Sequence, residues 1–314
     1  IRRVTGHSFF MKYRYPAMLH TMPKNLVIFG GFAIGLILMV SIYGVLHARR
    51  VYVRQDPVVI EKSSSLPGLK IALIADLHLG YNSTKSHVRK IVDTINSQNV
   101  DLVCIAGDLF DNDYDAIKDP DKVADILSGI KSRYGTYACW GNHDVSEKIL
   151  AGFTFPQKET IVRDGRFTEF LHHAGITMLE DETVCINNAF YLVGRRDKDM
   201  AKKEQLPRKT FAEITEPLDP SLPIIVMDHQ PGELSEASDA GVDLDLSGHT
   251  HDGQMFPANL VVHFLWENAC GVLKKGSMTS IVTSGAGVWG PAMRVGTNNE
   301  VVIANVSFDP AAGQ

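Results

Sequence analysis

Short apolar runs that end in acidic, imidazole or amide side chains recur along most of this 314-residue chain. From residue 70 onward, these runs alternate with segments whose apolar residues have the spacing of a helix. Strands are expected over residues 70–75, 101–106 and 136–140, with helices over 84–98 and around 120–132 between them. This β-α-β-α-β order is typical of an α/β sandwich that carries its helices on the outside.

The second half of the chain adds more strands than helices. Helices are expected over residues 166–175 and 231–241. The strands expected here cover residues 176–179, 183–186, 190–194, 223–228, 242–247, 280–284 and 300–308. We therefore expect one α/β domain over residues 70–308, followed by a tail over residues 309–314.

Five short polar motifs directly follow expected strands. They are Asp76-Leu77-His78, Gly107-Asp108, Gly141-Asn142-His143-Asp144, His229 and Gly248-His249-Thr250-His251. Each motif alone has a structural explanation, such as a helix cap or a turn. In open α/β sheets, however, the carboxyl ends of the strands line up at one edge, where ligands bind. The joint occurrence of the motifs at strand ends therefore predicts that their side chains meet in one crevice.

The side chains in these motifs are carboxylates, imidazoles and an amide, without a thiolate. This mixture suits divalent ions such as Mn, Fe, Zn or Co and argues against a structural zinc site. The motifs also hold more candidate ligands than one ion can use. A pair of ions about 3.5–4 Å apart, bridged by one carboxylate, accounts for the surplus.

A run of 21 residues without a charge, Leu26–Leu46, lies near the N-terminus. A helix of that length crosses a hydrocarbon core of about 30 Å. A signal peptide fits less well because Arg49 and Arg50 follow the run in place of a small-residue cleavage site. A core helix fits less well because the run has no polar face. The expected order is a basic segment over residues 1–24, a transmembrane helix over 25–46 and a linker over 47–69.

Charge gives little information on the side of the membrane that the domain faces. Residues 1–24 carry five Lys and Arg and residues 47–66 carry four, so the positive-inside rule gives no preference. The dense basic run HARRVYVR after the apolar run favours a position of the α/β domain on the cytoplasmic side of the cell membrane. The chain begins with Ile1, so we expect this span to be single or the last of several.

Charge and cysteine content argue against two other classes of protein. The formal net charge is −5 and the Lys and Arg residues are dispersed, so the basic surface expected of a nucleic-acid binder is missing. Nucleic acid is therefore not an expected partner. The four cysteines form no CxxC pair, and in a domain of this size we expect thiols rather than a disulfide framework.

Taken together, the five motifs resemble those of the calcineurin-like metallophosphoesterase superfamily, over roughly residues 69–308. The stretches IALIADLHLG, GHTHDGQ and TSGAGVWGPAMR, with the preceding apolar run, are most similar to the YkuE/YaeI-type membrane-associated branch. Ala75 stands where that branch often has Ser, and Asp252 where Gly is usual; neither change removes a ligand. The resemblance implies a four-layer α/β/β/α sandwich preceded by a transmembrane helix.

The resemblance also implies roles for individual residues. It places one divalent metal ion, with manganese favoured, on Asp76, His78, Asp108 and His251. It places a second ion on Asp108, Asn142, His229 and His249, with Asp108 as the bridge. His143 would donate a proton to the leaving group or stabilise its charge, and Asp144 would either orient the ring of His143 or hold a turn.

The implied function is hydrolysis of phosphodiester or pyrophosphate bonds by a membrane-anchored enzyme, with lipid-linked nucleotides of the UDP-diacylglucosamine type as candidate substrates. The apolar stretch Leu260–Trp266 is expected to line the pocket mouth, to enter lipid headgroups or to pack in the core. A nuclease or phosphoprotein phosphatase on the same scaffold is one alternative. A catalytically silent metal-binding membrane scaffold is another, and it is disfavoured because the seven ligand positions and His143 are intact.

Overall fold

The computed structural model of this chain describes residues 23–147, 149–150, 153–154 and 163–309. The chain divides into two compact units, residues 1–42 and 43–314. The described part of the first unit lies almost entirely in helix α1 (Lys24–His47). Within the described residues, α1 is the one helix long and apolar enough to cross a membrane, with a mean hydropathy of 2.4.

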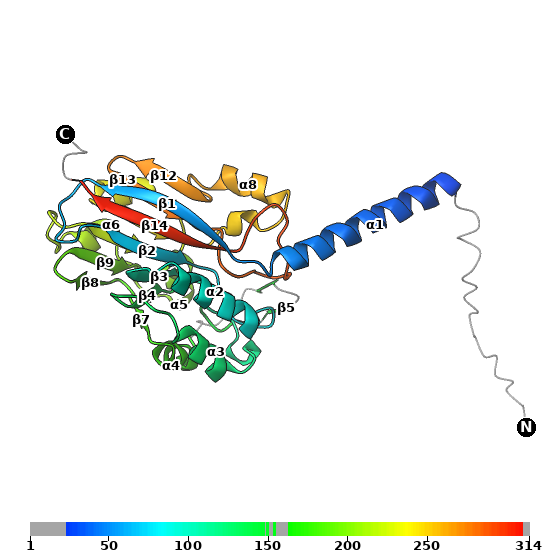
Figure 1. The fold of residues 1–314 in the computed structure, drawn as a ribbon, viewed down its shortest axis with the longest axis horizontal. Helices are drawn as coiled ribbons and strands as arrows, with labels where there is room; N and C mark the ends of the chain where they lie inside the picture. Colours follow the sequence, from blue (N-terminus) through cyan, green and yellow to red (C-terminus); the bar gives the residue numbers. More distant parts are fainter. Residues whose placement is uncertain (1–22, 148, 151–152, 155–162, 310–314) are drawn as a thin grey trace, which may run out of the picture. The chain divides into compact units, whose positions relative to one another are not determined.

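Two six-stranded sheets form the second unit (Figure 1). The first sheet has the order β1-β14-β2-β3-β4-β7, in which only the β14–β2 pair is antiparallel. Its strands are β1 (Tyr52–Ile60), β14 (Glu300–Phe308), β2 (Leu69–Ile74), β3 (Leu102–Ala106), β4 (Thr136–Cys139) and β7 (Ile176–Met178). Helices α2 (Lys85–Ser97), α3 (Pro120–Leu127) and α4 (Gly165–His173) pack on one face of this sheet.

The second sheet has the order β12-β13-β11-β10-β9-β8, with antiparallel pairs at both edges. Its strands are β12 (Gly271–Lys275), β13 (Met278–Val282), β11 (Leu244–Ser247), β10 (Ile224–Met227), β9 (Phe190–Gly194) and β8 (Glu182–Ile186). Helices α6 (Phe211–Thr215) and α7 (Leu234–Asp239) cover its outer face. The other elements are η1 (Tyr114–Ala116), β5 (Ile149–Leu150), β6 (Phe153–Thr154), α5 (Lys198–Glu204), η2 (His251–Gly253) and α8 (Ala258–Leu265).

The alternation of side chains along β3 explains how the layers pack. Val103 and Ile105 point to the helices α2 and α3, whereas Leu102 and Cys104 belong to the cluster between the two sheets. That inner cluster also takes Leu246 and other residues from the second sheet. Each fully buried aliphatic side chain of this kind contributes roughly 1.5–3 kcal/mol. The four-layer α/β/β/α prediction is confirmed.

The structure differs from the linker expected over residues 47–69, because Tyr52–Ile60 form strand β1 and pair in parallel with β14. Val58 and Ile60 on this strand are buried between the sheets, which gives the strand a core-facing side. Pro57 lies within this strand, although proline cannot donate a hydrogen bond to a strand ladder. An edge strand tolerates proline, however, because one of its sides makes no ladder hydrogen bonds, and β1 lies at the edge of its sheet.

All four cysteines are free thiols, as expected. Cys104 and Cys139 are buried in strands, whereas Cys185 is exposed. Of the three alternatives for Leu260–Trp266, packing in the core is wrong, because helix α8 contains no buried residue. Phe264 is 90% exposed and Leu265 is 71% exposed. This helix therefore presents an apolar surface that no described residue covers.

Candidate active site

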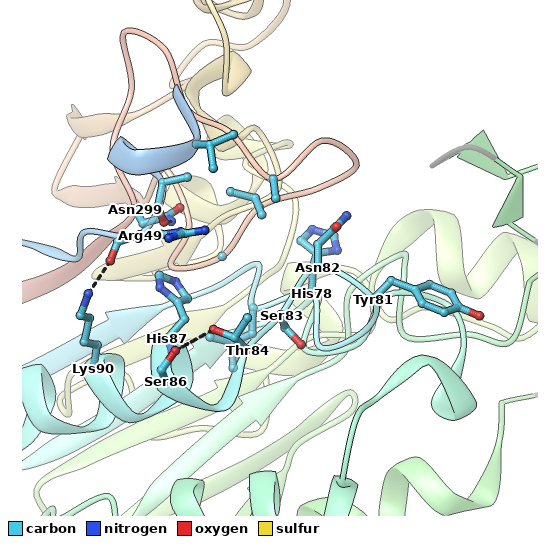
Figure 2. Close-up of a pocket in the computed structure, with 16 residues that line it drawn as sticks. Arg49, His78, Tyr81, Asn82, Ser83, Thr84, Ser86, His87, Lys90 and Asn299 are labelled. Atoms are coloured by element: carbon cyan, nitrogen blue, oxygen red, sulfur yellow. Dashed lines mark hydrogen bonds between the residues drawn. The ribbon is translucent and has the colours of Figure 1, made fainter. Parts of the chain in front are cut away.

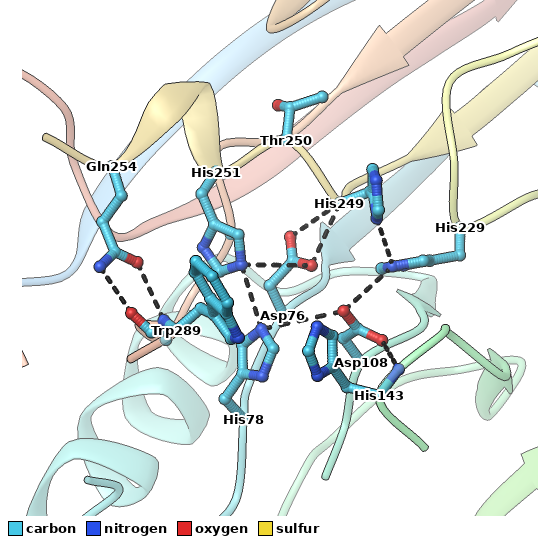
Figure 3. Close-up of polar contacts among 12 residues, drawn as sticks. Asp76, His78, Asp108, His143, His229, His249, Thr250, His251, Gln254 and Trp289 are labelled. Atoms are coloured by element: carbon cyan, nitrogen blue, oxygen red, sulfur yellow. Dashed lines mark hydrogen bonds and ion pairs between the residues drawn. The ribbon is translucent and has the colours of Figure 1, made fainter. Parts of the chain in front are cut away.

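The predicted ligands lie together at the carboxyl ends of strands from both sheets (Figure 3). Asp76 follows β2, Asp108 follows β3, Asn142 follows β4, His229 follows β10, and His249 and His251 follow β11. The two sheets face each other across the inner core, so segments separated by more than 170 residues, such as His78 and His251, meet here. The polar motifs that follow separate strands therefore meet in one place in the fold.

One group of donor atoms consists of Asp76, His78 and His251, whose candidate ligand atoms all lie within 4.8 Å of one another. The Nε2 atoms of His78 and His251 are 3.0 Å apart, and His251 Nε2 lies 3.8 Å from Asp76 Oδ1. All three side chains are buried. Three donors aimed at one point in a buried space form a site that a cation can occupy.

A second group consists of Asp108, His229 and His249, which meet the same 4.8 Å criterion. His229 Nε2 lies 3.1 Å from Asp108 Oδ2, 3.2 Å from His249 Nδ1 and 3.2 Å from Asn142 Oδ1. Asp108 Oδ2 is also 3.8 Å from His78 Nε2 in the first group. The Asp108 carboxylate therefore lies between the two groups.

The hydrogen bonds of His229 show that these donors fit a cation. Its Nδ1 donates to the carbonyl of Ala106 at 2.8 Å, which leaves a lone pair on Nε2 of the neutral ring. That lone pair faces the Asp108 carboxylate, which is itself an acceptor. Two acceptors at this distance repel each other unless a proton or a metal ion lies between them. Nitrogen and oxygen donors without sulfur suit divalent ions such as Mn, Fe, Zn or Co.

Electrostatics within the site point the same way. Burial lowers the pKa of His229, but Asp108 and Asp76 outweigh burial and raise that pKa well above its usual range. Burial and the neighbouring His78 instead hold the pKa of His251 well below its usual range. The carboxylates of the site therefore attract positive charge, and His229 takes a proton readily whereas His251 does not. Bound divalent cations would satisfy the carboxylates and leave the imidazoles neutral, as metal ligation requires.

Several predicted ligands have a backbone conformation that is unusual for residues other than glycine. The φ angles are 56° at Asp76, 43° at His78, 50° at Asp108, 71° at His249 and 51° at His251. Such conformations cost on the order of 1–3 kcal/mol each and gather at functional sites. Their concentration on the predicted ligands indicates that the fold gives up stability to aim these side chains.

Two motif glycines are explained by close packing around the same site. A Cβ on Gly141 would lie 2.2 Å from Asp108 Oδ1 and 2.3 Å from the Asp108 nitrogen. A Cβ on Gly248 would lie 2.4 Å from the Cβ of Ala75 and 2.8 Å from Asp76 Oδ2. Any side chain at either position would therefore displace a predicted ligand.

The structure corrects the orienting role expected for Asp144. Its carboxylate accepts hydrogen bonds from the backbone N–H groups of Gly141 at 2.7 Å and Phe110 at 2.8 Å, and it makes no hydrogen bond to the ring of His143. Those two N–H groups face inward at a tight turn, so they need a buried acceptor. The turn-holding alternative for Asp144 is the one the contacts support.

Asn112, which was not among the predicted site residues, is the hydrogen-bond partner of the His143 ring. His143 Nδ1 lies 2.5 Å from Asn112 Oδ1. The Nδ2 group of Asn112 donates to the carbonyl of Val145 and to the Glu147 carboxylate, which identifies Oδ1 as the acceptor. Asn112 is buried and has a φ of 61°. Its position four residues after Asp108 was the only sequence signal available.

Two charged residues near the first group were also missed. Asp111 Oδ1 lies 3.5 Å from Nδ1 of His78, an atom with no hydrogen-bond partner among the described residues. The buried guanidinium of Arg294 donates to the carbonyls of His251 at 3.0 Å, Ser284 at 2.6 Å and Gly287 at 2.8 Å. Arg294 therefore ties the segment that carries His251 to the C-terminal loop, a role that the spacing of motifs does not reveal.

Two indole rings flank the site. The ring of Trp266 lies 5.3 Å from that of His249 at an angle of 74°, and the ring of Trp289 lies 6.0 Å from that of His143. Trp266 directly follows the exposed apolar helix α8. The apolar surface of α8 is thus continuous with one wall of the candidate site.

Comparisons with known proteins agree with this arrangement. The sequence profile of the calcineurin-like phosphoesterase family matches residues 69–253. A Helicobacter pylori protein named "Uncharacterized metallophosphoesterase" is 32% identical over 251 residues, covering 79% of this chain and 62% of that protein. A Danio rerio "Transmembrane protein with metallophosphoesterase domain" is 28% identical, covering 84% of this chain and 59% of that protein.

A third relative has a named activity. The "UDP-2,3-diacylglucosamine pyrophosphatase LpxG" of Chlamydia muridarum is 25% identical over 228 residues, covering 62% of this chain and 67% of that protein. The chain spans about three-fifths of the length of the Helicobacter and Danio relatives. With the family profile matching more than half of the sequence and all five polar motifs lying within the match, this chain belongs to the calcineurin-like phosphoesterase family.

Proposed function

We propose that this chain is a membrane-anchored phosphoesterase that binds two divalent metal ions, with manganese favoured, and cleaves phosphodiester or pyrophosphate bonds. Membership of the family makes the chain a hydrolase of phosphate esters, and the family is metal-dependent. The observation that carries the two-ion proposal is the position of Asp108, whose Oδ2 lies 3.1 Å from His229 and 3.8 Å from His78. One carboxylate within reach of both donor groups is what a bridged pair of ions needs.

Metal ions held by these residues would supply charge neutralisation for the phosphate oxygens and activation of the attacking water. Asp76, His78 and His251 would hold one ion, and Asp108, Asn142, His229 and His249 the other. Asp108 would serve both ions. The strained backbone at five of these positions fixes the donors before the ions bind.

His143 is proposed to pass a proton to the leaving oxygen. Its Nδ1 donates to Asn112 Oδ1, which leaves Nε2 as the nitrogen that exchanges a proton. Burial lowers the pKa of His143 to about 4, so the ring is neutral near pH 7, and Nε2 would take up a proton from the attacking water before it passes a proton to the leaving oxygen. The backbone N–H of His143 donates to Asp108 Oδ1 at 2.8 Å, which couples its position to the proposed bridge.

We infer that the substrate is amphiphilic and held at a bilayer surface, as in a lipid-linked nucleotide of the UDP-diacylglucosamine type. Three observations support this. Helix α1 has the length and hydropathy of a membrane span. Helix α8 exposes Phe264 and Leu265 beside a wall of the site. One relative is named as a pyrophosphatase of such a lipid.

The test uses the full chain, purified in detergent and loaded with Mn. Hydrolysis of a soluble diester, bis(p-nitrophenyl) phosphate, is measured beside that of a lipid-linked nucleoside diphosphate ester in mixed micelles. We expect turnover of both, a strong preference for the lipid-linked ester, and loss of that preference in Phe264→Ser/Leu265→Ser. Turnover of the soluble diester with none of the lipid-linked ester in any micelle would rule out the lipid substrate and leave the phosphoesterase assignment standing.

A further inference from the structure

A cavity of about 500 Å³ adjoins the candidate site on the side of His78 (Figure 2). Its walls come from the end of α1 and the residues after it, from the loop before α2, from α2 itself and from the 287–292 loop. All of these residues belong to the second unit of the chain. Leu77 and His78 form the wall shared with the site. A ligand in the cavity would therefore be continuous with a group bound at the predicted metals.

The charges that line this cavity have one sign. Arg49 and Lys90 are lining residues, and neither an aspartate nor a glutamate is among the lining residues that the structure describes. Lys90 Nζ donates to the backbone carbonyl of Arg49 at 2.8 Å, which holds the two residues together. Within the described part of the chain, no carboxylate forms an ion pair with either of them. Unpaired cations around a hollow attract an anion.

The remaining polar lining consists of groups that bind phosphate or sugar oxygens. It includes three hydroxyl residues and two amides, namely Ser83, Thr84, Ser86, Asn82 and Asn299. In the view of Figure 2, Arg49, His87 and Lys90 lie toward one end of the hollow, and Asn82 and Tyr81 toward the other. A ligand that spans the cavity would thus meet cations at one end and neutral hydrogen-bonding groups at the other.

The cavity wall next to α1 is fixed in place. The carbonyl of Gly44 accepts a hydrogen bond from the backbone nitrogen of Arg294 at 3.0 Å, and the carbonyl of Ala48 accepts one from Asn299 Nδ2 at 2.6 Å. Arg294 is also the residue that holds the segment of His251. The end of α1 is therefore connected to the candidate site through Arg294, whose backbone nitrogen binds Gly44 and whose guanidinium binds the carbonyl of His251.

We propose that this cavity binds a second anionic group of the substrate, of the phosphate or sugar-phosphate class, while the scissile phosphorus lies at the predicted metals. Arg49 and Lys90 are then specificity-determining residues, and they select esters with two anionic groups over simple diesters. This inference rests on the proposed phosphoesterase function. It adds to that function the part of the substrate that lies beyond the bond that is cleaved.

The test compares two soluble substrates with the Mn-loaded full chain in detergent. Bis(p-nitrophenyl) phosphate has one anionic group, whereas uridine diphosphate N-acetylglucosamine has two. For Arg49→Gln/Lys90→Gln, we expect KM for the two-phosphate substrate to rise roughly tenfold or more, because charge-assisted hydrogen bonds are lost. kcat for that substrate and both constants for the simple diester should stay within about twofold of wild type. Arg89→Gln, an exposed cation on α2 outside the cavity, is the matched control.

A binding measurement separates this inference from the proposed function. Inorganic phosphate is titrated by calorimetry into the metal-free full chain, where the predicted metal site holds no metal ion. We expect wild type and Arg89→Gln to bind phosphate and Arg49→Gln/Lys90→Gln to lose that binding. If wild type hydrolyses neither substrate yet binds phosphate through Arg49 and Lys90, the proposed function fails and the pocket stands. Equal phosphate binding by wild type and the double variant, or equal KM changes for both substrates, would overturn the pocket.

Discussion

His143 Nδ1 lies 2.5 Å from Oδ1 of Asn112, so a neutral amide, and not the adjacent carboxylate of Asp144, sets the direction of this ring. Because a neutral partner does not stabilise an imidazolium as a carboxylate does, the ring keeps a low affinity for a second proton. We predict that Asn112→Ala lowers kcat for a diester about 10- to 100-fold and changes KM little, since the ring loses its orientation. Steady-state kinetics of the Mn-loaded chain measures this.

Asn112→Asp is the informative companion variant, because it keeps an acceptor oxygen beside Nδ1. We expect it to recover part of kcat and to shift the pH profile of kcat toward higher pH, since the new carboxylate raises the pKa of His143. Equal kcat in wild type and Asn112→Ala, or a recovery with no change in the pH profile, would contradict this role for Asn112.

Gly141→Ala should abolish metal-dependent activity. The added Cβ would lie 2.2 Å from Asp108 Oδ1, so the proposed bridging carboxylate would have to move. We expect a loss of more than about 100-fold in kcat, because displacing the proposed bridging ligand would misplace the reacting groups. Gly165→Ala is the matched control, because nothing lies within 4 Å of a Cβ at that position. Wild-type activity in Gly141→Ala would contradict this prediction, because it would mean that the turn accepts a Cβ without moving Asp108.

Much of this arrangement was predictable from the sequence because strand ends carry the chemistry. Apolar runs located β2, β3 and β4, and the side chains after them, such as Asp76 and Asp108, follow at fixed offsets. Such signals can be recognised in the sequence because a buried strand needs a continuous apolar run. They predict that the ligands meet in one crevice, but they do not predict which metals the ligands would hold.

The remaining features depend on contacts between distant segments. Strand β1 contains Pro57 and buries only one of its two sides, so its sequence gives a weak strand signal. Its hydrogen bonds to the distant strand β14 stabilise it as a strand. Asn112 contacts the ring of His143, and Arg294 contacts the carbonyl of His251, and only the folded chain brings these groups together. The same holds for Asp144, whose two backbone partners become visible only when the turn has formed.

Stability should depend on pH through Asp245. Burial, and then the nearby Asp228, raises the pKa of Asp245 to about 7, whereas an unfolded Asp has a pKa near about 3.9. The folded carboxyl holds its proton more tightly, so its contribution to stability is complete below about pH 4 and is lost as pH rises through about 7. Relative to Asp245→Asn, wild type should lose on the order of 4 kcal/mol between these limits.

Urea denaturation of both proteins from about pH 4 to pH 8 measures this difference in the free energy of unfolding. Asp239→Asn, at an exposed position on α7, controls for the removal of one surface carboxylate. A wild-type minus Asp245→Asn difference that does not change with pH would mean that the folded carboxyl titrates as it does in the unfolded chain.

Arg294→Lys should weaken both the fold and the site. The guanidinium donates to three backbone carbonyls and to the side chain of Asn299, and an ammonium on a flexible stem cannot reproduce that fork. We expect a loss of about 2–4 kcal/mol in the free energy of unfolding, from unpaired buried carbonyls, together with weaker Mn binding. Arg89→Lys, on the exposed face of α2, should change neither. Unaltered Mn affinity in Arg294→Lys would separate this residue from the site.

The central claim is that Asp108 joins two metal ions at a phosphoester-cleaving site, and a titration of the metal-stripped full chain with Mn tests it most directly. Bound Mn per chain and hydrolysis of bis(p-nitrophenyl) phosphate are measured together for wild type, Asp108→Ala and His143→Ala. We predict two ions and metal-dependent turnover in wild type, fewer ions and no turnover in Asp108→Ala, and two ions with kcat reduced by about 10²–10⁴ in His143→Ala. Turnover by the metal-free chain, or wild-type turnover in Asp108→Ala, would contradict the account.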